Sequence, residues 1–418
     1  MRRIRWRTLA ATLAAAAIGA CRDGRRQAPV TQTTSWDSAG VTIVENSVLA
    51  QVPHWRLAAT PMRVIGGNDT ATSQQLFGAS SAMLTTDGHL VIGNSGANEV
   101  LVLSGDGRSS LTFGRRGRGP GEFGGTIRVW PSEADEILVE DIGWQGKLLR
   151  FSVTGALTEE VLLPPRISYR GGAWSDAAVS PAGVQFMLGE PLGIPDPGPS
   201  RPLRGPASVV RFSYYGEVLD TIATYLGIEL LRADVGPQPA FGGGMVSGPR
   251  TIAPLFGPTT RLAGGGSPWH VVVADQAQAS FQVFLEDGTR IRDVRWQPDQ
   301  RRPTSADIVR AGEAYVQSHR QDKPGAIRAL EVMPPVSVSP VFDHIVVGRD
   351  NRIWIRAYVL PTDPAARWWI FEDGGRLVAE IEMPVDARVL EAGADYVIAH
   401  LTDAFDVERI KLWSIDLI

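Results

Sequence analysis

The sequence predicts an all-β fold, and both its composition and its hydrophobic pattern favour that class. The chain has 418 residues, of which 45 are glycine and 29 are proline. This share of turn-forming residues favours many short strands over long helices. Hydrophobic residues make up 44% and charged residues 21%, which is typical of a globular chain and argues against long disorder. At this length an all-β chain can form one large domain.

A short apolar segment recurs six times along the chain. Each copy has an alternating apolar run with Leu, Phe or Trp at its fourth position. In five copies a turn containing glycine and a second apolar run follow, which is the pattern of a β-hairpin. The six copies are VLVLSGDGR (100–108), LLRFSVTGA (148–156), VVRFSYYGE (209–217), FQVFLEDGT (281–289), WWIFEDGGR (368–376) and IKLWSIDLI (410–418).

A further strand bounded by Gly, Asn or Asp precedes each hairpin, and weaker apolar stretches such as SSAMLTTD (80–87) precede these strands. The repeating unit is therefore four antiparallel strands. Successive hairpins begin 42 to 87 residues apart, with the excess in loops. Units of this kind bury their faces only against neighbouring copies. The sequence thus predicts a six-bladed β-propeller over residues 36–418.

The N-terminus predicts an export signal. A basic stretch with four arginines precedes the apolar segment LAATLAAAAI (9–18), which is too short to span a bilayer. Cys21 follows the aliphatic and small residues that the bacterial lipobox requires, and this stretch therefore resembles a lipoprotein signal: Ile18, Gly19 and Ala20. We predict a signal peptide over 1–20, lipidation of Cys21 and a polar tether over 21–35. The alternative is a cleaved signal with an unrelated cysteine nearby.

Charge and cysteine content indicate which partners and which cellular location to expect. Cys21 is the only cysteine, so no intrachain disulfide can form. Without the signal the chain has 37 basic and 45 acidic residues, a net charge of −8. This acidic balance argues against nucleic acid as the main partner. We expect a membrane-anchored protein on the periplasmic side of the cell envelope, and Arg22, in place of an aspartate after the cysteine, favours the outer membrane.

The segment FGRRGRGPGEF (113–123) is rich in arginine and glycine and lies between the first two units. A phosphate-binding loop would be followed by a helix, whereas a strand follows here. Glycine allows the sharp turns, and Pro120 stiffens the segment. We therefore predict that it carries the chain from the outer strand of one blade to the inner strand of the next, with the side chains of Arg115, Arg116 and Arg118 in solvent.

Residues 304–333 predict a short helical insertion between the fourth and fifth units. Thr304 and Asp307 fit a capping pair at a helix start. The apolar face of this helix is predicted from the spacing of Ile308, Ala311 and Tyr315. Pro324 and Gly325 are expected to end the helix, with a second short helix after them.

The sixth unit reaches Ile418 at the end of its third strand, so its outer strand is missing from the repeat. Either of two N-terminal segments, 40–46 or 55–67, can supply it. We expect the second segment to do so, because closure by the opposite end of the chain leaves no open sheet edge.

At this point the chain resembles a known family. HLVIGNSGANEVLVLSGDGR (89–108), GRRGRGPGEF (114–123) and WDSAGVTIVEN (36–46) are similar to segments of bacterial six-bladed β-propeller proteins related to NHL repeats, of the exported lipoprotein type. The resemblance covers residues 36–418 and is weakest in units three and six. It implies a fold and a location in the cell envelope, and says little about chemistry.

A ring of polar residues is the best candidate site. By repeat symmetry, six residues just after the second strand of each unit point toward one mouth of the propeller: Asn94, Asp141, Glu190, Asp275, Arg356 and His400. Such a ring could hold a divalent cation, with calcium the expected ion, and it resembles in outline the calcium-dependent lactonases of the gluconolactonase type. The alternative is that these residues cap strand ends and turns. Arg356 opposes a purely cationic site.

Two functions from different classes follow. One is a binding module, with no catalytic residue and no cofactor, that holds a protein, peptide or glycan through long loops at the same rim, 189–208 and 357–367. The other is a metal-assisted hydrolase or lyase with its site at the mouth. No HxH, HExxH or G-x-S-x-G spacing occurs, which argues against a zinc site or a nucleophile elbow. The long loops favour the binding module.

Overall fold

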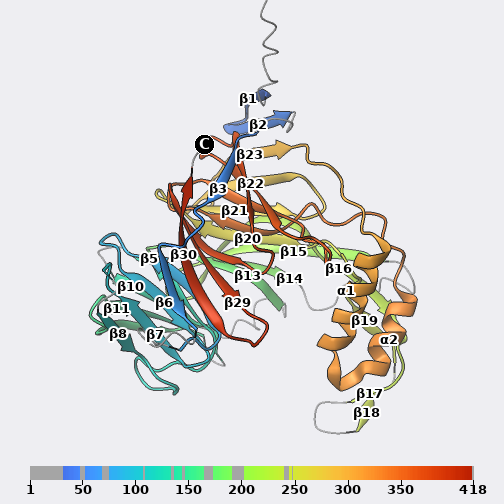
Figure 1. Cartoon of the computed structure of the whole chain (residues 1–418), viewed down its shortest axis with the longest axis horizontal. Helices are drawn as coiled ribbons and strands as arrows, with labels where there is room; N and C mark the ends of the chain where they lie inside the picture. Colours follow the sequence, from blue (N-terminus) through green and yellow to red (C-terminus); the bar gives the residue numbers. More distant parts are fainter. Residues whose placement is uncertain are drawn as a thin grey trace, which may run out of the picture.

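A computed structural model of the chain describes residues 32–47, 52–67, 75–106, 109–132, 136–143, 146–163, 173–190, 202–239, 244–246 and 248–416 (Figure 1). The predicted signal peptide, Cys21 and most of the tether lie outside these residues. Within the described part of the chain, no helix is both long enough and apolar enough to cross a membrane.

The repeated unit is a four-stranded antiparallel sheet. Unit one consists of β5 (Ala79–Leu84), β6 (Leu90–Asn94), β7 (Glu99–Leu103) and β8 (Ser110–Phe113). Unit two consists of β9 (Ile127–Pro131), β10 (Glu136–Asp141), β11 (Lys147–Ser152) and β12 (Leu157–Leu162). Both units run in chain order from first to fourth strand, as the predicted hairpin repeat requires.

Units three and four have the same order with added strands. Unit three consists of β13 (Ala173–Val179), β14 (Gln185–Glu190), β15 (Leu203–Phe212) and β16 (Val218–Ala233), extended by β19 (Arg250–Ile252). Unit four consists of β20 (Thr260–Gly265), β21 (His270–Asp275), β22 (Ser280–Leu285) and β23 (Arg290–Trp296). Strands β17 (Gln238–Pro239) and β18 (Met245–Val246) form a separate small hairpin.

Units five and six are joined in one nine-stranded sheet. Unit five consists of β24 (Phe342–Val347), β25 (Ile353–Ala357), β26 (Ala366–Phe371) and β27 (Leu377–Met383). Unit six consists of β28 (Arg388–Ala392), β29 (Tyr396–Thr402) and β30 (Glu408–Asp416), with β4 (Arg63–Gly66) antiparallel to β30. Strand β3 (His54–Leu57) pairs with both β27 and β30 and so links the two units.

The N-terminal strands agree with the closure predicted for segment 55–67, because β4 supplies the fourth strand beside β30. The alternative donor, segment 40–46, lies elsewhere. It forms most of β2 (Val41–Ser47), which pairs in parallel with β23 at the outer edge of unit four, while β1 (Gln32–Ser38) pairs with β2. The sequence did not predict that β1 and β2 extend the sheet of unit four.

Each sheet is covered on both faces, which explains why β6 is buried along its whole length. Successive side chains of a strand point to opposite faces. Leu90 and Ile92 pack against Ile398 of unit six, whereas Val91 packs against Val129 of unit two. Comparable core clusters join units two and three, three and four, four and five, and five and six.

The first strands of the units lie nearest to one another. Strand β5 contacts β9 and β28, β20 contacts β13 and β24, and β24 contacts β28. Four-stranded antiparallel sheets that stack face to face around their first strands form a β-propeller. The chain is therefore an all-β propeller with a helical addition, and Figure 1 shows the helices to one side of the sheets, beside β16 and β19.

The arginine- and glycine-rich segment connects β8 to β9, as predicted. The Glu122 carboxylate accepts hydrogen bonds from the Arg115 side chain at 2.7 Å and from the Gly119 backbone N–H at 2.8 Å. Gly114 has a φ of +87°, and a Cβ atom there would overlap the ring of Phe123. Glycine is thus required at this position by both the backbone angle and the close ring.

The helical insertion contains α1 (Ser305–Ser318), a single 3-10 turn (Arg320–Asp322) and α2 (Lys323–Val332). The predicted capping box of Thr304 and Asp307 is present. The predicted apolar face is only partly right, because Ile308 is exposed and the buried residues of α1 are Asp307 and Gly312. Pro324 lies in the first turn of α2, where its missing N–H costs no helical hydrogen bond.

Candidate functional site

The six residues of the predicted ring lie at one end of their sheets. Each is on the second strand of its unit and is paired in register with a residue at or near the start of the first strand. The pairs are Asn94–Ala79, Asp141–Ile127, Glu190–Ala173, Asp275–Thr260, Arg356–His344 and His400–Arg388. The ring residues therefore lie one strand outside the first strands, which contact one another.

Two ring members anchor the chain that enters their own sheet. The buried Asn94 side-chain oxygen accepts a hydrogen bond from the Phe77 N–H at 2.7 Å. The buried Asp141 carboxylate accepts from the N–H groups of Gly124 at 2.7 Å and Gly143 at 2.9 Å. These bonds satisfy backbone donors beside the strand ends, which is a capping role.

Two other members form ion pairs within the described chain. The Asp275 carboxylate lies 2.8 Å from the Arg204 guanidinium, and the side chains of both residues are mostly buried. The Arg356 guanidinium lies 2.5 Å from the Asp343 carboxylate. Burial raises the pKa of Asp343, and the neighbouring Arg356 opposes that rise. Arg204 and Arg356 thus offset the negative charges of the Asp275 and Asp343 carboxylates, and a bound cation would need such charges.

His400 is 3.0 Å from the Glu408 carboxylate, and the side chain of Glu190 lies outside what the structure describes. Among the described side chains, no group of three or more His, Cys, Asp or Glu residues is placed to hold a metal ion. A cation site at this ring stays a prediction that the described contacts do not favour.

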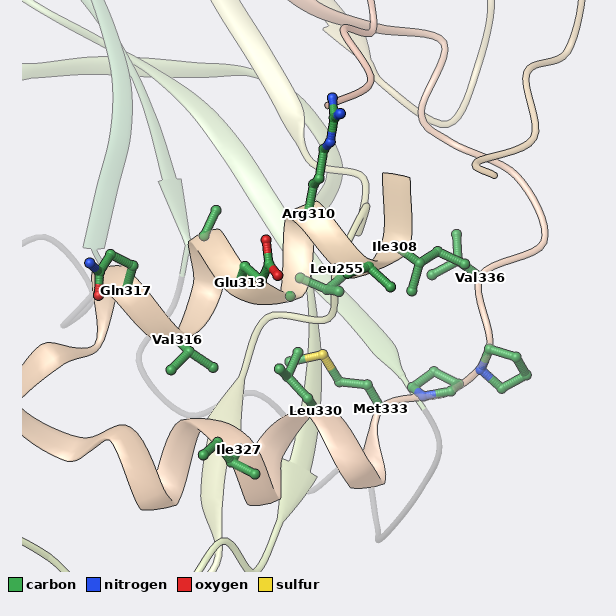
Figure 2. Close-up of a pocket in the computed structure, with 15 residues that line it drawn as sticks. Leu255, Ile308, Arg310, Glu313, Val316, Gln317, Ile327, Leu330, Met333 and Val336 are labelled. Carbon is green, nitrogen blue, oxygen red and sulfur yellow. The ribbon is translucent and has the colours of Figure 1, made fainter. Parts of the chain in front are cut away.

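An open apolar groove lies between α1, α2 and the segment after α2 (Figure 2). Its volume is about 1090 Å³. Figure 2 shows Leu330 of α2 and Met333, just after that helix, pointing toward Leu255. Apolar side chains dominate its walls: Leu255, Ile308, Val309, Val316, Ile327, Leu330, Met333, Pro334, Pro335 and Val336.

The groove exposes side chains that a helix hairpin normally buries. Val309 is 59% exposed and Ile327 is 50% exposed. Gly312 of α1 faces Leu330 of α2, and an added Cβ at Gly312 would lie 3.5 Å from the Leu330 side chain, in ordinary van der Waals contact. Polar side chains are also present in the lining, from Arg310, Glu313 and Gln317. A contiguous exposed apolar surface with polar residues near it is characteristic of an interaction site.

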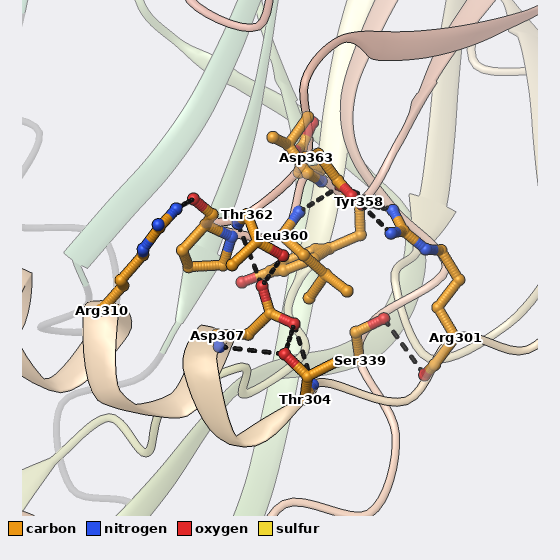
Figure 3. A network of polar contacts seen from close by, with 12 residues as sticks. Arg301, Thr304, Asp307, Arg310, Ser339, Tyr358, Leu360, Thr362 and Asp363 are labelled. Carbon is orange, nitrogen blue, oxygen red and sulfur yellow. Dashed lines mark hydrogen bonds and ion pairs between the residues drawn. The ribbon is translucent and has the colours of Figure 1, made fainter.

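A polar network fixes α1 to the loop that follows β25 (Figure 3). The Asp307 carboxylate accepts hydrogen bonds from the N–H of Thr362 at 3.0 Å and from its hydroxyl at 2.7 Å. The Arg301 guanidinium binds the Asp363 carboxylate with two nitrogens, at 2.6 and 2.7 Å. Arg310 donates to the Pro361 carbonyl at 3.2 Å. We call these contacts the clamp.

Burial alone would raise the pKa of Asp307, but hydrogen bonds from Thr304 and Thr362 outweigh it and lower the pKa to about 2. Asp307 is therefore ionised at neutral pH. Charge-assisted hydrogen bonds are stronger than neutral ones, which suits this residue to hold two segments together.

The far side of the hairpin is fixed to unit three. Arg250 and Asp322 form an ion pair at 2.7 Å, and the Arg328 Nε donates to the Val235 carbonyl at 2.6 Å. Ala329 and Val235 share a small buried cluster. Because the hairpin is held at both ends, the groove between its helices has a defined shape.

The sequence predicted the helical insertion and a recognition face that includes loop 357–367, and the clamp joins these two features. It did not predict the groove. The signal that could have revealed it is the spread of apolar residues around the whole of α2 and on two faces of α1, such as Val309, Val316 and Ile327. A helix that packs on one side only needs a single apolar stripe. Most of the other loop, 189–208, lies outside the described residues.

Comparisons with known proteins place the chain near solved structures only at low similarity. No protein-family model matches the sequence, and no curated protein matches it. A protein from Bacteroides fragilis described as exported is 11% identical, with a TM-score of 0.45, over 88% of this chain and 100% of that one. A DUF4221 family member from Bacteroides vulgatus is 10% identical, with a TM-score of 0.47, over the same shares.

Virginiamycin B lyase from Staphylococcus aureus is 11% identical, with a TM-score of 0.38, over 84% of this chain and 98% of that one. At this level of identity, and with TM-scores below 0.5, these likenesses carry no argument about family, ligand or activity.

Proposed function

We propose that this chain is an exported, lipid-anchored propeller of six blades that binds a stretch of another polypeptide in the groove between α1 and α2. The observation that carries the proposal is the open apolar groove of about 1090 Å³, whose walls are fixed to the propeller at both ends of the hairpin. A rigid site loses little conformational entropy on binding, which favours affinity.

The six-bladed ring is supported by the shared core clusters. Six four-stranded units follow one another, and each packs on the next, including unit six on unit one through Ile398 and Leu90. Strand β4 completes unit six. A ring of this kind leaves no long sheet edge exposed and forms a stiff base for the hairpin.

The chemistry of the groove favours a polypeptide over a glycan. Among the described residues, its lining contains Leu, Ile, Val, Met and Pro side chains and no aromatic residue. The sugar rings of a glycan stack on aromatic side chains. Aliphatic walls instead accept the apolar side chains of a helix or an extended segment. Met333 adds an adaptable contact, because its unbranched side chain fits partners of different shape.

The location follows from sequence signals that lie outside the described residues. The lipobox-like stretch before Cys21 and the polar segment after it support an envelope protein tethered on the periplasmic side, with the outer membrane favoured. A tether of this kind would let the propeller turn freely at the membrane surface while the groove remains accessible to partners.

Site-specific photo-crosslinking tests the proposal. A photoreactive residue is placed at Val309 in the groove, or at Tyr215, which is exposed on unit three, and each full-length protein is irradiated in its native envelope. We expect a polypeptide adduct from position 309 that is absent from position 215. The adduct is then identified, and the binding of the purified partner segment to the purified chain is measured by fluorescence anisotropy.

Matched variants decide the outcome. Ile327→Asp places a charge in the groove, whereas Leu219→Asp places one on β16 at a residue of similar exposure, 47%. We expect Ile327→Asp to weaken binding of the purified segment at least tenfold and Leu219→Asp to leave it unchanged, at equal melting temperatures. Equal binding by both variants, or adducts with lipid alone, would contradict the proposal.

A further inference from the structure

A cavity of about 810 Å³ lies between units three and four and shares no lining residue with the groove. Its walls come from β15 and β16 on one side and from β21, β22 and β23 on the other. Asp275 and Ser280, at the end of β21 and the start of β22, place it at the same end of the sheets as the predicted ring. Sites for small ligands have volumes of about 300 to 1,000 Å³, so this cavity is large enough to be one.

A second cavity, of about 380 Å³, adjoins the first along the outer part of unit four. Gln278 and Ser280 line both cavities. The other walls of the second cavity come from β2 and β23, with Thr34 of β1 beside them. We call the two cavities together the trough. It extends from unit three to the N-terminal strands.

Each charged side chain that lines the trough is paired with a side chain of opposite charge. The pairs are Arg204–Asp275 at 2.8 Å, Arg295–Glu45 at 3.1 Å and, through the Arg290 Nε, Arg290–Asp293 at 2.7 Å. Because positive and negative charges balance in every pair, the described walls favour an uncharged ligand over a cation or an anion.

The free hydrogen-bonding groups of the trough belong to neutral side chains. The Gln282 side-chain oxygen accepts a hydrogen bond from the Tyr225 hydroxyl, and the Gln282 Nε2 has no partner among the described residues. The side chains of Gln278, Ser280 and Gln297 also lack a hydrogen-bond partner in the part of the chain that the structure describes. A carboxamide both donates and accepts hydrogen bonds. The trough therefore offers donors and acceptors that carry no charge.

Contacts between its walls fix the shape of the trough. Tyr225 packs on the core cluster shared by units three and four, and its hydrogen bond to Gln282 joins the two units. Arg204, which pairs with unit four, also donates to the carbonyls of Leu226 and Gly227, each at 2.7 Å. A site that is already formed loses little conformational entropy when a ligand binds.

We infer that the trough binds a neutral oligosaccharide. Each hydroxyl of a sugar both donates and accepts hydrogen bonds, which matches the free carboxamides of the trough. The half-buried Tyr225 adds an aromatic side chain, the kind of surface on which sugar rings stack. Ile222 and Leu226 supply apolar contacts for the C–H groups of the ring. The two adjoining cavities suit a chain of sugars better than a single one.

The surrounding strands argue against an extended peptide as the ligand. Such a peptide binds by adding a strand to a free sheet edge. The outer edge of β23, beside the second cavity, is already paired with β2. The inference is independent of the polypeptide that we propose for the groove.

Calorimetric titration of the full chain, in a detergent without a sugar headgroup, tests the inference with maltotriose, cellotriose and tri-N-acetylchitotriose. We expect one of these trimers to bind more tightly than its own monomer, because the trimer reaches both cavities. Its Kd should be the same at about 50 and about 500 mM NaCl, because salt screens only interactions between charges. The inference is overturned if no trimer binds, if the monomer binds equally well, or if only trigalacturonate or a blocked trialanine peptide binds.

Leucine substitutions remove single amides at similar side-chain volume. Gln278→Leu and Gln282→Leu should each raise the Kd of the trimer about five- to tenfold, because a sugar hydroxyl loses its partner. Gln321→Leu is the matched control for Gln278→Leu, since both glutamines are exposed and Gln321 lines neither cavity. Its Kd should equal that of the wild type. Melting temperatures show whether each variant is folded. The inference fails if neither trough variant weakens binding, or if Gln321→Leu weakens it as much as Gln278→Leu does.

Discussion

Two hydrogen bonds join the Asp307 side chain to Thr362 across 55 positions of sequence, one from the Thr362 hydroxyl and one from its backbone N–H. Asp307 lies in the first turn of α1, and Thr362 lies in the loop after β25. One carboxylate thus fixes both the start of a helix and the loop of a blade, and the stability of the groove depends on it.

Asp307→Ala is expected to lower the free energy of unfolding by about 2 kcal/mol, because it removes the capping box and both bonds to Thr362. Urea unfolding followed by circular dichroism measures this. Glu313→Ala, on an exposed position of the same helix, is the control and should change stability by less than about 0.5 kcal/mol. Equal effects of the two substitutions would show that the clamp contributes nothing.

The same carboxylate predicts acid sensitivity of the hairpin. The pKa of Asp307 in the folded chain is about 2, below its ordinary value of 3.8, so its stabilising effect is complete above pH 3.8 and is lost as the pH falls toward 2. Hydrogen exchange of α1 amides, measured between pH 5 and pH 2 and corrected for intrinsic rates, should reveal this loss. In Asp307→Asn, exchange should lose most of this pH dependence.

Glu391, on β28 of unit six, predicts the opposite trend, a loss of stability as the pH rises. Burial raises its pKa from 4.5 to about 7, although Tyr396 and the Leu84 N–H bond to it. A raised pKa means that its contribution is complete below pH 4.5 and declines as the pH rises through 7. Glu391→Gln should therefore have a higher melting temperature than the wild type at pH 8. An exposed control, Glu382→Gln, should show no such gain.

Gly114 tests the connection between units one and two. Gly114→Ala would combine a positive φ with a clash against Phe123, and we expect it to cost about 3 kcal/mol or more. Gly88 has a similar φ of +84° but nothing within 4 Å of an added Cβ, so Gly88→Ala should cost only about 1 kcal/mol. Thermal unfolding measures the loss of stability in both variants. Equal losses would exclude a role for the contact with the Phe123 side chain.

Ile65 tests the pairing of β4 with β30. It is buried against Leu76, Ile410 and Leu412, whereas its neighbour Val64 is 43% exposed. Ile65→Ala should destabilise the chain by about 2 to 4 kcal/mol, and Val64→Ala by less than 1 kcal/mol. Chemical denaturation would measure both. A small effect at Ile65 would mean that unit six is stable without its N-terminal strand.

The parts of the fold that sequence could predict are those set by local pattern. Alternation and glycine turns define the strands of each unit, and the capping pair of Thr304 and Asp307 marks the start of α1. Long-range pairing was predictable only where the repeat lacked a strand, as at β4. The parallel pairing of β2 with β23 does not replace a strand that is missing from the repeat, so no local sequence pattern predicted it.

The candidate sites were harder to predict for a physical reason. Repeat symmetry identifies equivalent positions but does not say which strand faces the centre. Asn94 and Asp141 are conspicuous in the sequence because capping residues stand at strand ends. The groove depends on how two helices sit on the sheets, and hydrophobic spacing cannot show which apolar side of α2 remains exposed.

Strand β3 lies between β27 and β30 and bonds to both, so two sheets share one short piece of backbone from the beginning of the chain. A polypeptide synthesised from its N-terminus must hold this piece unpaired until the last sheet has been made. Such a waiting edge strand is a target for stray β-pairing. The chain therefore has an interval during folding in which a chaperone would have most effect, and that interval ends only when the final strand pairs.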